Sequence, residues 1–368
     1  MARRIMGRLF RLFLVLLLAL STVSGQNTVS PQLKTRPSEP PPPPPGGTDR
    51  QITLDVQVTD KSGAPVRGLQ KQDFTLLDDK QPKNILSFHA VDSGAASATD
   101  PPIEIVLVVD AVNASPEAVA YERSEVKKFL RQNGGKLVQP VSLVVFTDTG
   151  TKIQEGSSRD GNALASLYDQ YETGVRSIGR SQGFYGAAER LDLSIKTLSS
   201  LVEYAEKQPG RKLVIWFSPG WPLLSGPNIQ LSDKDERQLF SLIVAASTGL
   251  RQARVTLYSV DPLGLEDAGG VRVSYYEEFL KGITSPSRAL PGDLGLQVLA
   301  VQSGGRVFNT TNNLTAAIAD CAADANAFYV LSFDAARAER GKEYHSLGVA
   351  VDKPGITART RTGYYAQP

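Results

Sequence analysis

The sequence predicts an α/β protein with a doubly wound, mostly parallel sheet and a small antiparallel β-sandwich built from N- and C-terminal segments. From Ile52 to Thr59 apolar and polar residues alternate strictly, as in a strand with one buried face. The middle of the chain instead has nearly continuous apolar runs, typical of parallel strands covered on both faces. These runs are Ile103–Val109, Val141–Phe146, Leu213–Phe217 and Val255–Val260. Because helical periodicity separates them, we expect strands and helices to alternate there.

Residues 1–25 resemble a secretory signal: four arginines, no acidic residue, the apolar run Leu12–Leu20, and small residues before Gln26. That run is about half of the ~20 residues that span a bilayer, so we expect no transmembrane span in the mature chain. Retention of the signal as an anchor is the alternative. Residues 26–50, with the run Pro40–Pro45, predict a stiff polyproline II spacer. Binding of a proline-recognition domain is the other interpretation of that run.

Three regions follow the spacer. Residues 51–95 form the expected N-terminal β module, with short strands at Asp73–Leu77 and Ile85–Phe88. Residues 101–325 form the α/β domain, in which Ser115-Pro116-Glu117 predicts a helix start and Arg190–Ala205 a helix. Residues 326–366 return to short strands, which we expect to pair with the N-terminal module.

Composition excludes several kinds of chemistry. Lys and Arg number 40 against 38 Asp and Glu, which argues against a nucleic-acid partner. One cysteine, Cys321, excludes an internal disulfide and a CxxC motif, and we expect it to be a small buried residue. Two histidines, His89 and His345, argue against a His-rich metal site. The chain contains no GxxxxGK[ST], GxGxxG or GxSxG motif, so phosphate-cradling loops and nucleophile elbows have no support.

Several segments together resemble the von Willebrand factor type A (VWA) superfamily, and most closely its exported, acidobacterial-type branch. The resemblance covers about residues 51–366 and implies a Rossmann-like VWA domain. It is carried by a buried strand that ends in Asp110, by Pro209–Ser218, and by the flanking segments Val56–Val66, Gly304–Arg306, Phe328–Leu331 and Gly363–Tyr365.

The resemblance also implies a metal-dependent adhesion site, with a cation held by a DxSxS loop, a threonine and a later aspartate. Here the loop has Asp110, but Val112 and Ala114 occupy the hydroxyl positions, and Ser218 occupies the later aspartate position. A hard cation needs ~6 oxygen ligands, so we predict a degenerate site with no bound metal and no cofactor. The alternative is a rewired loop in which Asn113 or Ser115 ligates Mg²⁺, Mn²⁺ or Ca²⁺.

Each of these rim residues also has a simpler structural interpretation. Asn113 would shape the turn and Ser115 would cap the helix. Trp221, in a Pro/Gly loop, would either anchor a partner or pack over the end of the sheet. The candidate binding rim therefore consists of Asp110, Asn113, Ser115, Ser218 and Trp221.

The leading functional hypothesis is an exported, non-catalytic interaction or scaffold protein, periplasmic or secreted, whose partner is a protein of the cell envelope or the extracellular space. The first alternative is a cation-dependent adhesion domain with a rewired metal loop. A remote alternative is an envelope hydrolase with Ser218 as nucleophile, although a serine needs an activating base and the sequence offers no plausible histidine.

Overall fold

The computed structural model describes residues 50–92, 102–171, 183–224, 231–264, 274–335, 338 and 341–366. The predicted signal and the spacer up to residue 49 lie outside the described residues. Within these ranges no helix is long and apolar enough to cross a membrane.

The central sheet has the strand order β11-β10-β9-β5-β6-β7, with β8 paired to β6. Strands β11 to β6 run parallel, whereas β7 and β8 are antiparallel to β6. The strands are β5 (Ile103–Asp110), β6 (Lys136–Thr147), β7 (Gly150–Ile153), β8 (Ser158–Asp160), β9 (Arg211–Phe217), β10 (Val255–Val260) and β11 (Val307–Phe308). The expected mixed α/β class with a mostly parallel sheet is confirmed.

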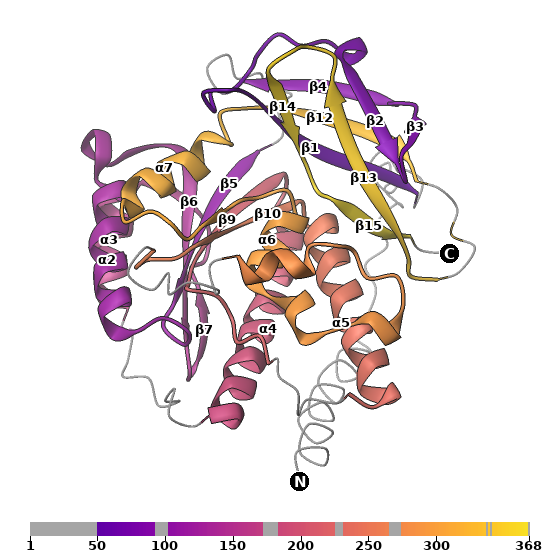
Figure 1. The fold of residues 1–368 in the computed structure, drawn as a ribbon. Helices are drawn as coiled ribbons and strands as arrows, with labels where there is room; N and C mark the ends of the chain where they lie inside the picture. The colour runs from indigo at the N-terminus through magenta and orange to yellow at the C-terminus, as the bar shows by residue number, and fades with distance from the viewer. Residues whose placement is uncertain are drawn as a thin grey trace, which may run out of the picture.

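Helices cover both faces of this sheet (Figure 1). One face packs against α2 (Pro116–Leu130), α3 (Gly161–Gln170) and α7 (Leu314–Ala323). The other face packs against α4 (Gly183–Lys207), α5 (Asp233–Gln252) and α6 (Leu296–Gln302). Because successive strand residues point to opposite faces, Leu107 joins the first core and Val106 and Val108 join the second. The central strands are therefore apolar at nearly every position.

Local signals account for some helix boundaries and miss others. Ser115 caps α2 by accepting a hydrogen bond from the Ala118 amide, and Pro116 is the first helical residue, as the sequence predicts. Helix α4 begins at Gly183, seven residues before the predicted start at Arg190. Short 3-10 helices lie at Lys71–Asp73, Gln132–Gly135, Tyr275–Phe279, Pro286–Arg288 and Pro291–Leu294.

Residues 51–92 and 327–366 form one sandwich of two antiparallel sheets, ordered β14-β1-β12-β4 and β15-β13-β2-β3. Strand β1 pairs with β12 and β14, and β13 pairs with β2. The apolar face of β1 shares one core with Tyr329, Leu331 and Phe333 of the adjacent β12 and with Phe74 and Leu76 of the opposite sheet. The strands are β1 (Gln51–Asp60), β2 (Phe74–Asp78), β3 (Gln81–Lys83), β4 (Ser87–Asp92), β12 (Ala327–Asp334), β13 (Glu343–Val351), β14 (Ile356–Arg359) and β15 (Gly363–Ala366).

Buried charges join the sandwich to the central sheet. Arg211, at the start of β9, lies over the Phe328 ring of β12 with 4.4 Å between its guanidinium carbon and the ring centroid. Its Nη1 donates to the Asp324 carbonyl at 3.1 Å, and its Nε lies 3.8 Å from a carboxylate oxygen of Asp55 in β1. Asp55 also pairs with Arg254. Arg211 therefore contacts groups from both halves of the molecule while only 1% of its surface is exposed.

Candidate functional site

Asp110 lies at the point where the winding of the sheet reverses direction. It is the last residue of β5, whose neighbours are β6 on one side and β9 on the other. In an open α/β sheet, ligands bind beyond the carboxyl ends of the strands at such a reversal. Because β5 pairs with β9, Asp110 lies beside Trp216 and Ser218 at the carboxyl end of β9. These residues therefore stand at the edge of the sheet where a ligand would be expected.

The Asp110 carboxylate is fully buried, and N–H donors of the protein surround it. Its Oδ1 accepts from the backbone amides of Val112 at 3.0 Å and Asn113 at 2.8 Å. Its Oδ2 accepts from Asn113 Nδ2 at 2.8 Å and from the Trp216 indole at 3.1 Å. Both oxygens are thus occupied by donors from β9 and from the loop after β5.

The protonation of Asp110 reflects two opposing effects. Burial raises the pKa of the Asp110 carboxyl above its usual range, because the charged form loses its hydration. Hydrogen bonds from Asn113, Trp216 and Ser218 act in the other direction by favouring the carboxylate. Burial has the larger effect on the pKa, so the folded state resists ionisation of this group.

The other rim residues take part in internal contacts. Asn113 is buried, and its Nδ2 also donates to Ser194 Oγ of α4 at 2.9 Å, whereas its Oδ1 has no hydrogen-bond partner in the described ranges. Ser115 caps α2. Ser218 is buried and accepts from the Gly220 amide at 3.2 Å.

The two positions that would carry hydroxyl ligands in a metal-dependent adhesion site are in the hydrophobic cores. Val112 packs in the core on the α4–α6 face, and Ala114 packs in the core on the α2–α7 face. Neither side chain carries an oxygen. The oxygen of the candidate set with no partner is Asn113 Oδ1, far short of the ~6 oxygens that a hard cation needs. The residues present do not fit a divalent cation of that kind.

Trp221 packs over the end of the sheet. Only 4% of its surface is exposed, and its ring meets that of Trp216 edge-on at 5.1 Å between centroids. It is therefore not an exposed anchor in this structure, and of the two interpretations open from the sequence the packing role applies. Its indole nitrogen has no hydrogen-bond partner among the described residues.

Sequence reasoning missed Trp216, Ser194 and Glu122 at this edge. The apolar run predicts that Trp216 is buried but not that its indole donates to Asp110. Glu122 of α2 is fully buried, and neither carboxylate oxygen has a hydrogen-bond partner among the residues described. In the sequence nothing distinguishes it from the other acidic residues of the helix. Burial, and after it the charge of Asp110, raise the pKa of Glu122 well above its usual range. No sequence signal identifies such residues, because their roles arise from contacts between elements.

No protein-family model and no curated protein matches the chain. Among solved structures it is similar to the PilB minor pilin of Streptococcus sanguinis, with 11% identity over 63% of each chain and a TM-score of 0.34. It is also similar to the pilus adhesin SpaC of Lactobacillus rhamnosus GG in its open conformation. That match has 11% identity over 82% of this chain and 42% of the other, with a TM-score of 0.38.

A third similar structure is the SpRpn10 VWA domain, with 12% identity over 53% of this chain and 94% of that domain, and a TM-score of 0.23. The chain spans less than two thirds of the length of the pilin and of the adhesin. The structural neighbours thus include a VWA domain and pilus proteins. With TM-scores below 0.5, these similarities carry no argument about the site.

Proposed function

We propose that the chain is an exported, non-catalytic interaction or scaffold protein whose VWA-like domain has a degenerate metal-dependent adhesion site. The observation that carries the proposal is the environment of Asp110, whose two oxygens accept four N–H groups of the protein. In this arrangement N–H groups of the protein satisfy both carboxylate oxygens without a cation.

The donor set also favours this proposal over a rewired cation site. Moving Asn113 or Ser115 onto a metal would break the Asn113–Asp110 hydrogen bonds or the cap of α2. Each such bond contributes about 0.5–1.5 kcal/mol, and more when one partner is charged. A cation would have to replace these bonds and also displace the indole of Trp216.

The hydrolase alternative lacks a histidine base near Ser218. The two histidines of the chain, His89 in β4 and His345 in β13, lie in strands of the sandwich, whereas Ser218 follows β9 of the central sheet. The Oγ of Ser218 accepts a hydrogen bond from the Gly220 amide, and the residue is buried. These contacts support a structural role for the serine.

Export, an envelope or extracellular protein partner, and a periplasmic or secreted location are further parts of the proposal. They rest on the resemblance of residues 1–25 to a secretory signal and on the proline-rich spacer after it.

The test is thermal unfolding of the chain from Gln26 in EDTA and then in millimolar Mg²⁺, Mn²⁺ or Ca²⁺. A ligand that binds only the folded state adds about 2.7 kcal/mol at a hundredfold excess over Kd. We expect no stabilisation that depends on Asp110, and we expect an immobilised sample to retain its envelope partner equally well in EDTA and in Mg²⁺.

The variant Asp110→Asn serves as the control. A cation-dependent rise in Tm that disappears in this variant would refute the degenerate-site proposal and favour cation-dependent adhesion. A rise that persists in the variant comes from another site. Esterase or peptidase activity that Ser218→Ala abolishes would refute the non-catalytic assignment.

A further inference from the structure

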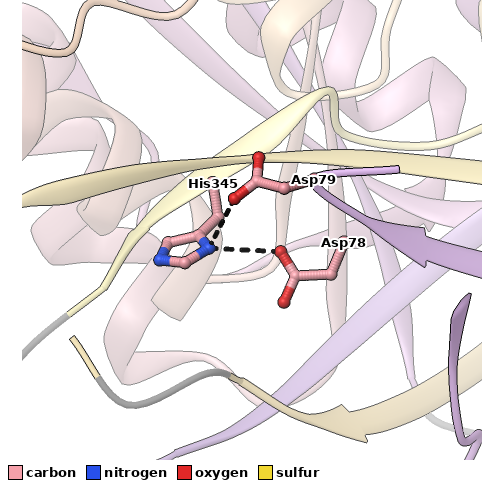
Figure 2. A group of neighbouring side chains, drawn as sticks. All are labelled: Asp78, Asp79 and His345. Atoms are coloured by element: carbon pink, nitrogen blue, oxygen red, sulfur yellow. Dashed lines mark ion pairs between the residues drawn. The ribbon is translucent and has the colours of Figure 1, made fainter. Parts of the chain in front are cut away.

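Three side chains that are far apart in sequence meet at one end of the sandwich (Figure 2). Asp78 ends β2, Asp79 begins the turn to β3, and His345 lies in the neighbouring strand β13. The Nδ1 atom of His345 lies 3.3 Å from Asp78 Oδ1 and 2.9 Å from Asp79 Oδ2. All three atoms lie within 4.8 Å of one another.

Each carboxylate has one oxygen held by the protein and the other directed at the imidazole. Asp78 Oδ2 accepts from the Tyr364 hydroxyl at 3.1 Å and lies 3.6 Å from Lys83 Nζ. Asp79 Oδ1 accepts from the backbone amide of Ser346 at 2.8 Å and from its hydroxyl at 3.0 Å. Groups around the cluster thus orient both carboxylates, as outer contacts orient ligands in metal sites.

The protein atoms alone leave this cluster incompletely bonded. With a single proton on Nδ1, His345 donates a hydrogen bond to the nearer oxygen, Asp79 Oδ2. Within the part of the chain that the structure describes, Asp78 Oδ1 is then buried without a hydrogen-bond donor, and the Asp78 side chain is only 2% exposed. A buried acceptor without a partner costs about 1–3 kcal/mol and is uncommon in folded proteins. A positive ion at the point shared by the three atoms would satisfy both oxygens and the nitrogen together.

We propose that Asp78, Asp79 and His345 bind a divalent transition-metal ion, with Zn²⁺ as the best fit. One imidazole and two carboxylates suit Zn²⁺, whereas Mg²⁺ and Ca²⁺ prefer oxygen ligands alone and in larger number. Zn–N and Zn–O distances of about 2.0–2.2 Å in a tetrahedron separate the ligand atoms by roughly 3.3 Å. The separations from Nδ1 to the two oxygens are close to that value.

Two further features suit a three-ligand site. The ring of His345 stacks on Tyr364, with 5.1 Å between centroids and 12° between planes, so its orientation is fixed before an ion arrives. The side chain of Asp79 is 51% exposed, so water reaches the cluster and supplies the fourth ligand. Among the described residues His345 Nε2 has no hydrogen-bond partner, whether the ring is metal-bound or metal-free.

The site would join the β2–β3 turn to β13, segments that are 266 residues apart. It lies in the sandwich, in different elements from Asp110. A negative result for the metal site would therefore leave the proposed function unaffected, and the reverse also holds.

The experiment uses the chain from Gln26 without a histidine tag. Because the chain has two histidines, imidazole ¹H–¹⁵N spectra show two side chains. We expect one equivalent of Zn²⁺ to shift the resonances of His345 and leave those of His89 in place. Calorimetry is expected to give one site per chain, and Co²⁺ is expected to give the visible absorption of a four-coordinate ion.

Variants assign the ligands. His345→Gln and Asp79→Asn should each weaken Zn²⁺ binding at least about tenfold, the lower end of the loss found even for residues that only support a ligand. Asp79→Asn changes a half-exposed side chain and so provides a readout if His345→Gln fails to fold. His89→Gln, in β4 of the other sheet, is the matched control and should keep the wild-type affinity. Absence of a Zn²⁺-dependent shift of His345, or an equal loss of affinity in His89→Gln, would overturn the proposal.

Discussion

Two tryptophans in the same core allow a direct test of the hydrogen bonds around Asp110. Trp216 and Trp221 are both buried and touch edge to face. The indole of Trp216 donates to Asp110 at 3.1 Å, whereas the indole nitrogen of Trp221 has no hydrogen-bond partner among the residues that the structure describes. Replacing either residue by phenylalanine removes an indole N–H and similar apolar surface. The two variants therefore differ mainly in the lost hydrogen bond.

The expected difference in the free energy of unfolding follows from that bond. A hydrogen bond to a charged group contributes about 1.5–3 kcal/mol, so Trp216→Phe should be less stable than Trp221→Phe by about that amount. Trp221→Phe also removes a buried donor that lacks a partner, which offsets part of its lost packing. The difference in the free energy of unfolding between the two variants should therefore be at least about 1.5 kcal/mol.

Acidic pH should reduce the difference. Loss of the indole donor raises the pKa of Asp110 further above its usual range, so ionisation destabilises the folded variant more than the wild type. The effect is largest above the folded-state pKa of Asp110. It fades as the pH falls below the folded-state pKa of the wild-type carboxyl, because Asp110 is then protonated in the folded state of both proteins.

The assay is denaturant unfolding at pH 8 and pH 4, followed by circular dichroism. Each variant retains one tryptophan, and coincident fluorescence and dichroism transitions check two-state behaviour. Equal stabilities at pH 8 within about 0.5 kcal/mol, below the contribution of even a weak hydrogen bond, would refute the reasoning.

Two further predictions concern other buried charges. Arg211→Met should lower the free energy of unfolding by about 1.5–3 kcal/mol in the same assay, because it removes a charged donor to the Asp324 carbonyl and leaves Asp55 paired with Arg254 alone. The surface control Arg67→Met should cost about 1 kcal/mol or less. A similar cost for both variants would contradict the role given to Arg211. Burial raises the pKa of the Glu122 carboxyl in the folded state, so the protonated side chain favours folding at a pH below the unfolded-state pKa. This contribution to the free energy of unfolding is lost as the pH rises through the folded-state pKa. Glu122→Gln should therefore be more stable than wild type at pH 8, with a gain that shrinks toward pH 4, and a variant less stable at pH 8 would count against this assignment.

Much of the fold follows from local patterns. Continuous apolar runs predict strands buried on both faces. Strands β5 and β10 lie within one residue of the predicted limits, and β9 begins two residues before the predicted Leu213. Alternation predicts the half-buried strand β1, although the strand at β2 is shifted by one residue, and β3 is not predicted because it is only three residues long. Strand β6 begins five residues before the predicted Val141, because its first residues lack the continuous apolar pattern.

The candidate site was less predictable than the fold. The sequence shows that Val112 and Ala114 carry no oxygen, and this follows from residue identity alone. It does not show that Trp216 donates to Asp110, because that contact depends on the pairing of β5 with β9.

The sequence by itself determined the mixed α/β class, the burial of the central strands, the cap of α2, and the lack of hydroxyl ligands in the loop after β5. These properties depend on residue identity and on neighbours a few positions away. Only the tertiary structure decided which donors occupy Asp110 and that His345 meets Asp78 and Asp79. The physical reason is that strand register sets contacts between distant residues, and register depends on the packing of whole faces. Asp78 and His345 are ordinary residues in their own segments, and they become a candidate site only where β2 pairs with β13.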